Sequence, residues 1–390
     1  MPITLGVPRE TFPGERRVAL TPRACEALQK IGIAVLIEEN AGAAAGFPDR
    51  HYLDRGVRMT NRADVFAAAD LVTQVRSLGA NPQAGLADLP LLHSGQVVIG
   101  FAEPLTSLQE CAELATRKVS LFAMELIPRI TRAQSMDALS SMATLAGYRA
   151  VILAASTLPK MFPMMMTAAG TIAPAKVFVL GAGVAGLQAI ATSKRLGAVV
   201  SAYDVRPAVK EQVESVGAKF VTLDVQTGEA EDKGGYAKAM DEAFYRRQRE
   251  LLTAVLREQD VVITTAAVPG LKAPVLITAE MAEAMPPGSV IVDIAAERGG
   301  NCELTRPGET FVHNGVTIIG PLNLPSALPR DASQLYSSNV SALIKLIAPK
   351  GDLVLNHEDQ IVRETLVTHE GQVVNARVLE LLAKAQAVTQ

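Results

Sequence analysis

The sequence predicts an α/β protein whose strands form parallel sheets, and three observations support this fold class. Short β-branched runs alternate with Ala- and Leu-rich stretches of helical period through most of the 390 residues, an alternation typical of strand–helix–strand units. Several runs are apolar throughout, as expected of strands that helices cover on both faces. Because a typical domain has roughly 100–200 residues, this chain, which is 49% hydrophobic, has material for two cores.

The first sheet is predicted from the first third of the chain. Its strands are expected at residues 3–7, 34–38, 71–75, 97–101 and 119–123. The intervening helices are expected at residues 22–31, 63–69 and 105–116. The charged stretch at 8–22 has the composition of an ordinary surface loop.

The second sheet is predicted from the middle of the chain, with strands at residues 177–180, 199–203, 219–222, 261–265, 290–293 and 316–319. Segment 137–162 is rich in Ala, Leu and Met, nearly free of charge, and predicted to be long helical material between the sheets. A helix at 335–348 and a hairpin at 353–374 follow, and they are expected to return to the first domain or to form a dimer contact. The predicted domains are therefore residues 1–140 with 330–390, and residues 141–329.

Composition excludes several classes of function. The formal net charge is −3, aromatic residues make up 4% and Trp is absent, so the chain lacks the basic field and the stacking platforms of a nucleic-acid-binding protein. Its three isolated cysteines give no disulfide framework and favour a reducing compartment, and its five histidines lack the spacing of a metal site. No apolar run is expected to reach the roughly 18–20 residues of a membrane span.

The strongest motif is a glycine turn between a predicted strand and a predicted helix. Gly181, Gly183 and Gly186 form GxGxxG, in which the glycines allow a tight turn, close approach to a pyrophosphate and helix–strand packing. Asp204 ends the next strand, about twenty residues on, where a carboxylate binds ribose hydroxyls. The motif predicts an NAD(H) site. Together with the alternation of strands and helices, it predicts two Rossmann-like parallel-sheet domains joined by long helices. Arg206 follows closely and offers a cation that could bind a 2′-phosphate, so NADP is the alternative cofactor.

Three further segments stand out, and two of them have two interpretations each. Residues 129–137 and Ser140 group two cations, an amide, a carboxylate and hydroxyls after a predicted strand, so they either orient a nicotinamide carboxamide or form a solvated helix start. The run Met164-Met165-Met166 is expected to fill a core, although three consecutive methionines are unusual. Residues 224–248 form a polar excursion that is either a surface loop or a functional flap.

With these motifs, the chain resembles the NAD(H)-binding component of proton-translocating nicotinamide nucleotide transhydrogenase. The similarity runs from Gly6 to about residue 345, and its most specific stretches are residues 124–137 (MELIPRITRAQSMD), 146–150 (AGYRA), 162–170 and 181–197. Residues 234–238 (GGYAK) resemble that family's mobile loop, which favours a flap.

The resemblance implies site residues, taken over position by position. The nicotinamide side, and with it catalysis, is assigned to Arg129, Gln134, Asp137 and Ser140. Neighbouring cofactor contacts are expected from Ile130, Thr131, Arg132, Ser135 and Met136. Adenosine and ribose contacts are expected from Val184, Asp204, Val205 and Arg206, and further contacts from Gly235, Tyr236, Gln248 and Ala267.

The resemblance also implies partners. Members of the family form homodimers that deliver hydride from NADH to NADP⁺ held by a separate NADP(H)-binding subunit, on a membrane-embedded proton-channel subunit. We therefore expect a cytoplasmic protein, peripheral at the inner face of the bacterial plasma membrane. Some members are fused to transmembrane helices; this chain stops at Gln390, which resembles the split arrangement with a separate soluble subunit.

Alanine dehydrogenase is the main rival interpretation, because it resembles residues 17–22 (RVALTP). That enzyme needs a Lys and a His general acid/base, but this chain has Gln74-Val75-Arg76 where the Lys is expected and Phe101-Ala102-Glu103 where the His is expected. A dehydrogenase that moves a proton together with the hydride needs a group to carry that proton, whereas transfer between two nicotinamides needs only contact between the rings. A non-catalytic NAD sensor is a third interpretation.

Overall fold

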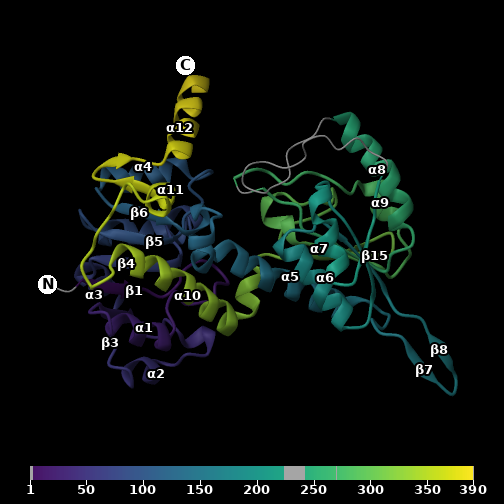
Figure 1. Ribbon diagram of the computed structural model, residues 1–390, viewed down its shortest axis with the longest axis horizontal. Coiled ribbons are helices and arrows are strands. Elements are labelled where there is room, and N and C mark those ends of the chain that lie inside the picture. Colours follow the sequence, from purple (N-terminus) through teal and green to yellow (C-terminus); the bar gives the residue numbers. More distant parts are fainter. Residues whose placement is uncertain (1–2, 224–241, 269, 390) are drawn as a thin grey trace. The chain divides into compact units, whose positions relative to one another are not determined.

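The computed structural model describes residues 3–223, 242–268 and 270–389 (Figure 1). The chain divides into two compact units, which we call unit 1 (residues 1–142 and 326–390) and unit 2 (residues 143–325). Each unit is built on its own sheet.

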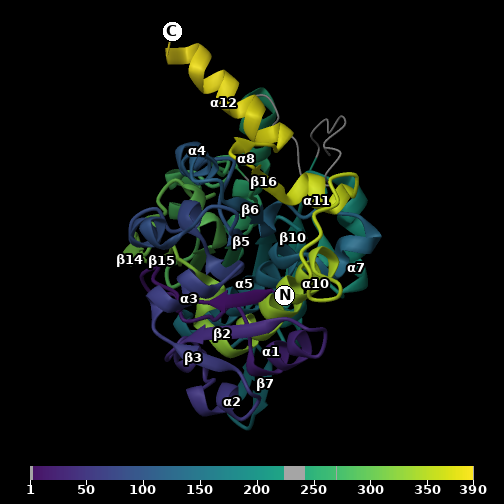
Figure 2. The ribbon, with the colours of Figure 1, turned by 90° about the vertical axis from the view of Figure 1, so that its left-hand side faces the viewer.

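The sheet of unit 1 has eight strands in the order β17-β16-β6-β5-β4-β1-β2-β3. Strands β1 to β6 run parallel, and Figure 2 shows β2 beside β3. The strands are β1 Thr4–Val7, β2 Ala34–Glu38, β3 Arg58–Thr60, β4 Leu71–Arg76, β5 Val97–Phe101, β6 Ser120–Ala123, β16 Leu366–His369 and β17 Gln372–Val373.

The helices of unit 1 follow the predicted alternation. They are α1 Pro22–Gln29, α2 Asp49–Leu53, α3 Arg62–Ala68, α4 Leu108–Thr116, α10 Pro329–Ile347, α11 Gln360–Thr365 and α12 Ala376–Thr389. Short 3₁₀ turns lie at η1 Ala43–Ala45, η2 Leu78–Ala80, η3 Ala84–Leu91, η4 Met124–Leu126 and η5 Thr131–Met136. Helix α10 packs on α1 and η5, and its buried Ser333 and Ser337 accept hydrogen bonds from the backbone N–H groups of Val18 and Thr21.

The C-terminal segment returns to unit 1, which was one of the two alternatives expected for it. Strand β16 pairs antiparallel with β6 and extends the first sheet. The prediction of a hairpin over all of 353–374 is wrong, because only β16 and β17 form one. Asp359 starts helix α11 by accepting the N–H of Ile361, so a helix occupies residues that the pattern assigned to a strand.

The main sheet of unit 2 has seven strands in the order β11-β10-β9-β12-β13-β15-β14. From β9, the chain adds β10 and β11 on one side and then β12, β13 and β15 on the other side. The strand order therefore reverses between β9 and β12, as in a doubly wound sheet. The strands are β9 Lys176–Leu180, β10 Val199–Tyr203, β11 Lys219–Phe220, β12 Val261–Thr264, β13 Val290–Asp293, β14 Thr310–His313 and β15 Val316–Ile319. Strand β14 is antiparallel.

Both faces of this sheet are buried. Successive residues of a strand point to opposite faces, so each face has its own set of buried side chains. Val177 and Val179 of β9 belong to one buried cluster, while Phe178 and Leu180 belong to another. The helices are α6 Val184–Arg195, α7 Lys210–Ser215, α8 Glu242–Leu256 and α9 Ala279–Glu283, with 3₁₀ turns at η6 Pro207–Val209, η7 Ile294–Arg298 and, at the unit boundary, η8 Leu324–Ala327.

The long helix α5 (Ala138–Thr157) begins in unit 1 and continues into unit 2. By length and composition it is apolar enough to cross a membrane, contrary to the expectation from the sequence. A single helix of this kind is weak evidence for a membrane span, because core helices have the same length and composition. Ala150, Val151 and Ala154 lie in the core of unit 2, so α5 serves as a core helix.

The methionine run corrects a second expectation. Met164, Met165 and Met166 are 60%, 40% and 73% exposed, so they do not fill a core. Met165 and Met166 lie in a two-stranded hairpin, β7 Met165–Thr167 and β8 Gly170–Ile172, that extends from the body of unit 2 (Figure 1), and Met164 directly precedes it. All residues of both strands are exposed because neither face of the hairpin packs on another element of its unit.

Candidate functional site

The glycine turn of unit 2 has the geometry that its sequence predicts. Strand β9 is followed by Gly181, whose φ of +99° favours glycine. A Cβ atom on Gly186 would lie 1.9 Å from the carbonyl oxygen of Gly181, so only glycine lets α6 pack this close. At Gly183, which precedes the first turn of α6, a Cβ would meet no atom of the described residues within 4 Å. The start of α6 is therefore open, and its first N–H groups are available to an anion.

Asp204, at the end of β10, holds both the glycine turn and its neighbour Arg206. Its buried carboxylate accepts the N–H of Ala182 at 2.8 Å and the N–H of Arg206 at 2.9 Å. The guanidinium of Arg206 binds the same carboxylate through Nε and Nη2, both at 2.9 Å. Asp204 thus lies beside the turn, and the charge of Arg206 is paired with it.

Gln248 lies beside the same strand end. This buried side chain donates from Nε2 to the hydroxyl of Tyr203 at 3.0 Å. Burial raises the pKa of Tyr203, so its hydroxyl stays protonated near neutral pH. Among the described residues, Oε1 of Gln248 is buried without a hydrogen-bond partner.

The remaining predicted contacts in unit 2 are placed as follows. Val184 is exposed at the start of α6, Val205 is half-buried, and Ala267 is exposed after β12. Gly235 and Tyr236, with most of the expected flap, lie outside the described residues. Thr265 was not among the predicted residues, yet its hydroxyl donates to the carbonyl of Gly181 at 3.0 Å and ties the end of β12 to the glycine turn.

The second predicted cluster lies in unit 1, around η5 and the start of α5. Asp137 accepts hydrogen bonds from the N–H and the hydroxyl of Ser140, an arrangement that caps the helix. Arg132 forms a two-fold ion pair with Asp359, at 2.7 and 2.8 Å. This pairing lowers the pKa of Asp359.

The backbone of η5 is fixed by helix α10. The carbonyl of Ser135 accepts from the side-chain amide of Asn339 on α10 at 2.9 Å. Ala133 and Met136 are buried. The other predicted contacts of this segment are exposed or half-buried: Arg129, Ile130, Thr131 and Gln134.

Comparison with known proteins decides the family. The alanine dehydrogenase/PNT N-terminal domain matches residues 6–146, and the C-terminal domain of the same name matches residues 150–376. A Rhodospirillum rubrum protein, named as one portion of NAD(P) transhydrogenase subunit alpha, is 46% identical over 378 residues, which are 95% of this chain and 97% of that protein. This chain belongs to the NAD(P) transhydrogenase α-subunit family.

Solved structures agree with this assignment. The crystal structure of transhydrogenase from Sinorhizobium meliloti is 44% identical and has a TM-score of 0.85, over 95% of this chain and 100% of that chain. A solved L-alanine dehydrogenase is 24% identical with a TM-score of 0.80, over 98% and 99% of the two chains, and shows the shared fold alone. The prediction of Rossmann-like parallel-sheet domains is confirmed.

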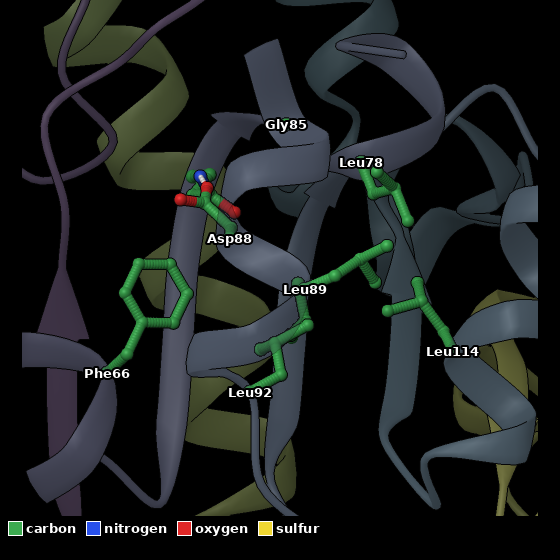
Figure 3. Close-up of a pocket in the computed structure, with 9 residues that line it drawn as sticks. Phe66, Leu78, Gly85, Asp88, Leu89, Leu92 and Leu114 are labelled. Atoms are coloured by element: carbon green, nitrogen blue, oxygen red, sulfur yellow. Dashed lines mark hydrogen bonds between the residues drawn. The ribbon is translucent and has the colours of Figure 1, made fainter. Parts of the chain in front are cut away.

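Gln74, which lies near the position where alanine dehydrogenase is expected to have a Lys, is held in a hydrogen-bond network. The amide of Gln74 donates to Asp88, and Asp88 is also bound by Arg62 through two nitrogens at 2.7 Å. A small pocket adjoins them, walled mainly by leucines and Phe66 (Figure 3). Because its two polar wall groups, Gln74 and Asp88, already bond to each other, we interpret this pocket as a packing void.

The charged stretch at 8–22 is not the ordinary surface loop that its composition indicated. Arg17 is 3% exposed and its guanidinium forks onto Glu15 at 2.6 and 2.7 Å. Glu10 accepts the N–H groups of Val75 and Arg76 at the end of β4. Burial and the neighbouring Glu15 raise the pKa of Glu10 to about 8.

Glu125 closes the end of the next strand in the same way. Its carboxylate accepts the N–H groups of Ala102 and Glu103 after β5. Burial, with Glu103, raises the pKa of Glu125 to about 7. Composition alone could not reveal these carboxylates, because only the fold brings them to the strand ends.

Proposed function

We propose that this chain is the NAD(H)-binding subunit of a proton-translocating transhydrogenase. In this function it binds NADH and presents it for hydride transfer to NADP⁺ on a partner subunit, coupled to proton movement across the membrane. The observation that carries the proposal is the open glycine turn at the start of α6 with Asp204 beside it, in a chain with relatives named as transhydrogenase α subunits.

The residues of unit 2 fit a dinucleotide. The uncovered space above Gly183 suits a pyrophosphate at a helix N-terminus. Asp204 suits ribose hydroxyls and repels a 2′-phosphate, and its fork with Arg206 keeps that cation from serving as a phosphate ligand. We therefore propose NAD(H) rather than NADP(H) for this chain. Val184, Val205, Gln248 and Ala267 are proposed as further contacts, together with Gly181, Gly186, Gly235 and Tyr236.

For the nicotinamide end, we propose contacts from the η5 segment of unit 1. Arg129, Gln134, Asp137 and Ser140 carry the proposed role in hydride transfer, as groups that orient the ring. The proposal is supported by the exposed side chains of Arg129 and Gln134 and by the fixed backbone of η5. Ile130, Thr131, Arg132, Ser135 and Met136 are proposed as neighbouring contacts.

The chemistry needs no proton carrier in this chain. NADH supplies a hydride, and direct transfer between two rings requires only their contact in the correct orientation. This favours transhydrogenation over alanine oxidation, because Gln74 is bonded to Asp88 and Glu103 stands near the position of the expected histidine. Alanine dehydrogenase activity is the alternative that the experiment below separates.

The proposed partners follow from the names of the relatives. A Rickettsia prowazekii protein that is 43% identical is likewise named as one portion of subunit alpha, which implies other subunits. We propose a membrane-embedded proton-channel subunit and an NADP(H)-binding subunit as partners, at the cytoplasmic face of the plasma membrane of a bacterium. We also propose a homodimer, supported by the exposed apolar hairpin of β7 and β8.

The test combines this protein with an NADP(H)-binding transhydrogenase subunit in the absence of membranes. NADPH should then reduce an NAD⁺ analogue whose reduced form absorbs at its own wavelength, and omission of either protein should abolish the reaction. Calorimetry should show that NADH binds this chain and that NADPH binds at least about tenfold more weakly. L-Alanine with NAD⁺ should yield no NADH. Alanine-dependent turnover without transhydrogenation would favour the alternative.

A further inference from the structure

The side chain of Asn301 binds both backbone polar groups of one residue, Ala266, just after β12. Its Nδ2 donates to the carbonyl of Ala266 at 2.8 Å and to that of Pro274 at 2.9 Å, while its Oδ1 accepts the N–H of Ala266 at 2.9 Å. The backbone carbonyl of Asn301 accepts the N–H groups of Leu276 and Ile277. Asn301 itself is 0% exposed, whereas its partner Ala266 is half-buried.

Asp293 holds Asn301 in place from the end of β13. Its Oδ2 accepts the N–H of Asn301 at 2.7 Å, the N–H of Cys302 at 3.0 Å and the hydroxyl of Thr305 at 2.6 Å. Its Oδ1 accepts the hydroxyl of Thr264 and the N–H of Ala295. This fully buried carboxylate therefore ties the ends of β12 and β13 to residues 301–305.

The clamped residue, Ala266, lies beside the proposed nucleotide site. Ala266 follows Thr265, whose hydroxyl binds the carbonyl of Gly181 in the glycine turn. In a doubly wound sheet a dinucleotide lies across the point where strand order reverses, here between β9 and β12. Asp204, at the end of β10, marks the adenosine half. The carboxyl ends of β12 and β13 therefore face the nicotinamide half.

We propose that Asn301, held by Asp293, is a positioning residue for hydride transfer: it fixes the Ala266–Ala267 backbone that meets the nicotinamide half of bound NAD(H). This inference rests on the proposed function. Asn301 acts through the backbone it holds and does not itself touch the nucleotide.

The carboxamide is suited to this task because the clamp needs a donor and an acceptor in one plane. In Asn301→Asp, the acceptor of the Ala266 N–H remains, but the donor to two carbonyls becomes an oxygen that repels both. The segment after β12 then shifts while the glycine turn and Asp204 stay in place. A displacement of about 1 Å at a reacting centre can cost roughly a hundredfold in rate.

The experiment measures two quantities on Asn301→Asp: the transfer rate with the NADP(H)-binding subunit, and the affinities for NADH and for ADP-ribose, which lacks nicotinamide. We expect the transfer rate to fall at least about tenfold while ADP-ribose binds within about twofold of the unsubstituted protein. The matched control is Asp260→Asn, at the opposite end of β12, where the carboxylate binds Lys160 and the N–H of Lys176. It should leave the transfer rate within about twofold.

Each other outcome overturns the inference. An unchanged transfer rate in Asn301→Asp shows that the clamp does not position the ring, and an equal loss of ADP-ribose affinity shows a general structural role. If Asn301→Asp does not fold, Thr305→Val, which removes one bond to Asp293, is measured with the same two readouts, and about a threefold loss of rate alone is expected. Failure of the unsubstituted protein to bind NADH would instead refute the proposed function itself.

Discussion

Each unit has a connection from a parallel strand to a helix, β1 to α1 in unit 1 and β9 to α6 in unit 2, and the two connections differ. In unit 2, residues 181–183 form a short glycine turn, and the start of α6 is open. In unit 1, residues 8–21 lead from β1 to α1, which starts with Pro22 and so lacks one N–H donor. The N–H of Thr21 is already bound by Ser337. An anion site at a helix start thus depends on what the preceding residues leave uncovered.

The strand ends differ in the same sense. In unit 1, Glu10 and Glu125 occupy backbone N–H groups at the ends of β4 and β5. In unit 2, Asp204 and Asp293 bind N–H groups from loops and leave the helix start clear. Acidic side chains therefore occupy the N–H groups at the strand ends of the first sheet, whereas at the strand ends of the second sheet they hold the neighbouring loops in place. Three predictions test this contrast.

The largest effect is expected from the glycines of the open turn. In Gly186→Ala, the new Cβ would collide with the carbonyl of Gly181, so α6 must move from β9; we expect both a lowered Tm and loss of detectable NADH binding. Gly183→Ala has free space and an ordinary φ of −76°. It should keep the Tm and still weaken NADH at least about tenfold, because the methyl group obstructs the pyrophosphate. Normal NADH affinity in Gly183→Ala would show that the pyrophosphate lies elsewhere.

A smaller effect is expected at Asp204. A hydrogen bond to a charged acceptor contributes about 1.5–3 kcal/mol, so Asp204→Ala should weaken NADH about tenfold, measured by calorimetry. The same change frees Arg206 from its fork, and the affinity ratio of NADPH to NADH should rise. Asp204→Asn is the matched control, since it keeps an acceptor for Ala182 and removes only the charge. An unaltered ratio in both variants would contradict the assignment of ribose binding to Asp204.

The smallest effect is expected at Glu10, which binds the N–H groups at the end of β4 in unit 1. Because burial raises the pKa of Glu10 from 4.5 to about 8, the folded state binds more protons than the unfolded state between these values. Its contribution to stability is thus complete below pH 4.5 and is lost as the pH rises through about 8. Glu10→Gln should flatten this part of the Tm–pH curve, at a cost of about 1 kcal/mol for one lost hydrogen bond. Glu309→Gln, at an exposed ion pair, should leave the slope intact; an unchanged slope in Glu10→Gln would refute the assignment.

Features that depend on residues close together in the chain could be predicted from the sequence. The strands 34–38, 97–101, 199–203, 290–293 and 316–319 were predicted with the bounds that the structure has, because buried parallel strands carry a continuous apolar signal. The glycine turn was predictable because its three glycines lie within six residues of one another and follow directly after a strand.

Features that depend on distant residues were not predictable. The enclosure of Arg17 and Glu10 depends on β4 and α10, far along the chain. The methionines were assigned to a core by composition, yet the hairpin exposes them. The clamp of Asn301 on Ala266 joins residues with no local motif between them.

The return of β16 to the sheet of unit 1 has a consequence for biosynthesis. All strands of unit 2 have left the ribosome before residues 366–369 are made, whereas β6 acquires its antiparallel neighbour only from those residues. Domains generally fold as units during translation. We therefore expect unit 2 to fold first during translation. Until residues 366–369 are made, β6 of unit 1 remains an unpaired edge strand.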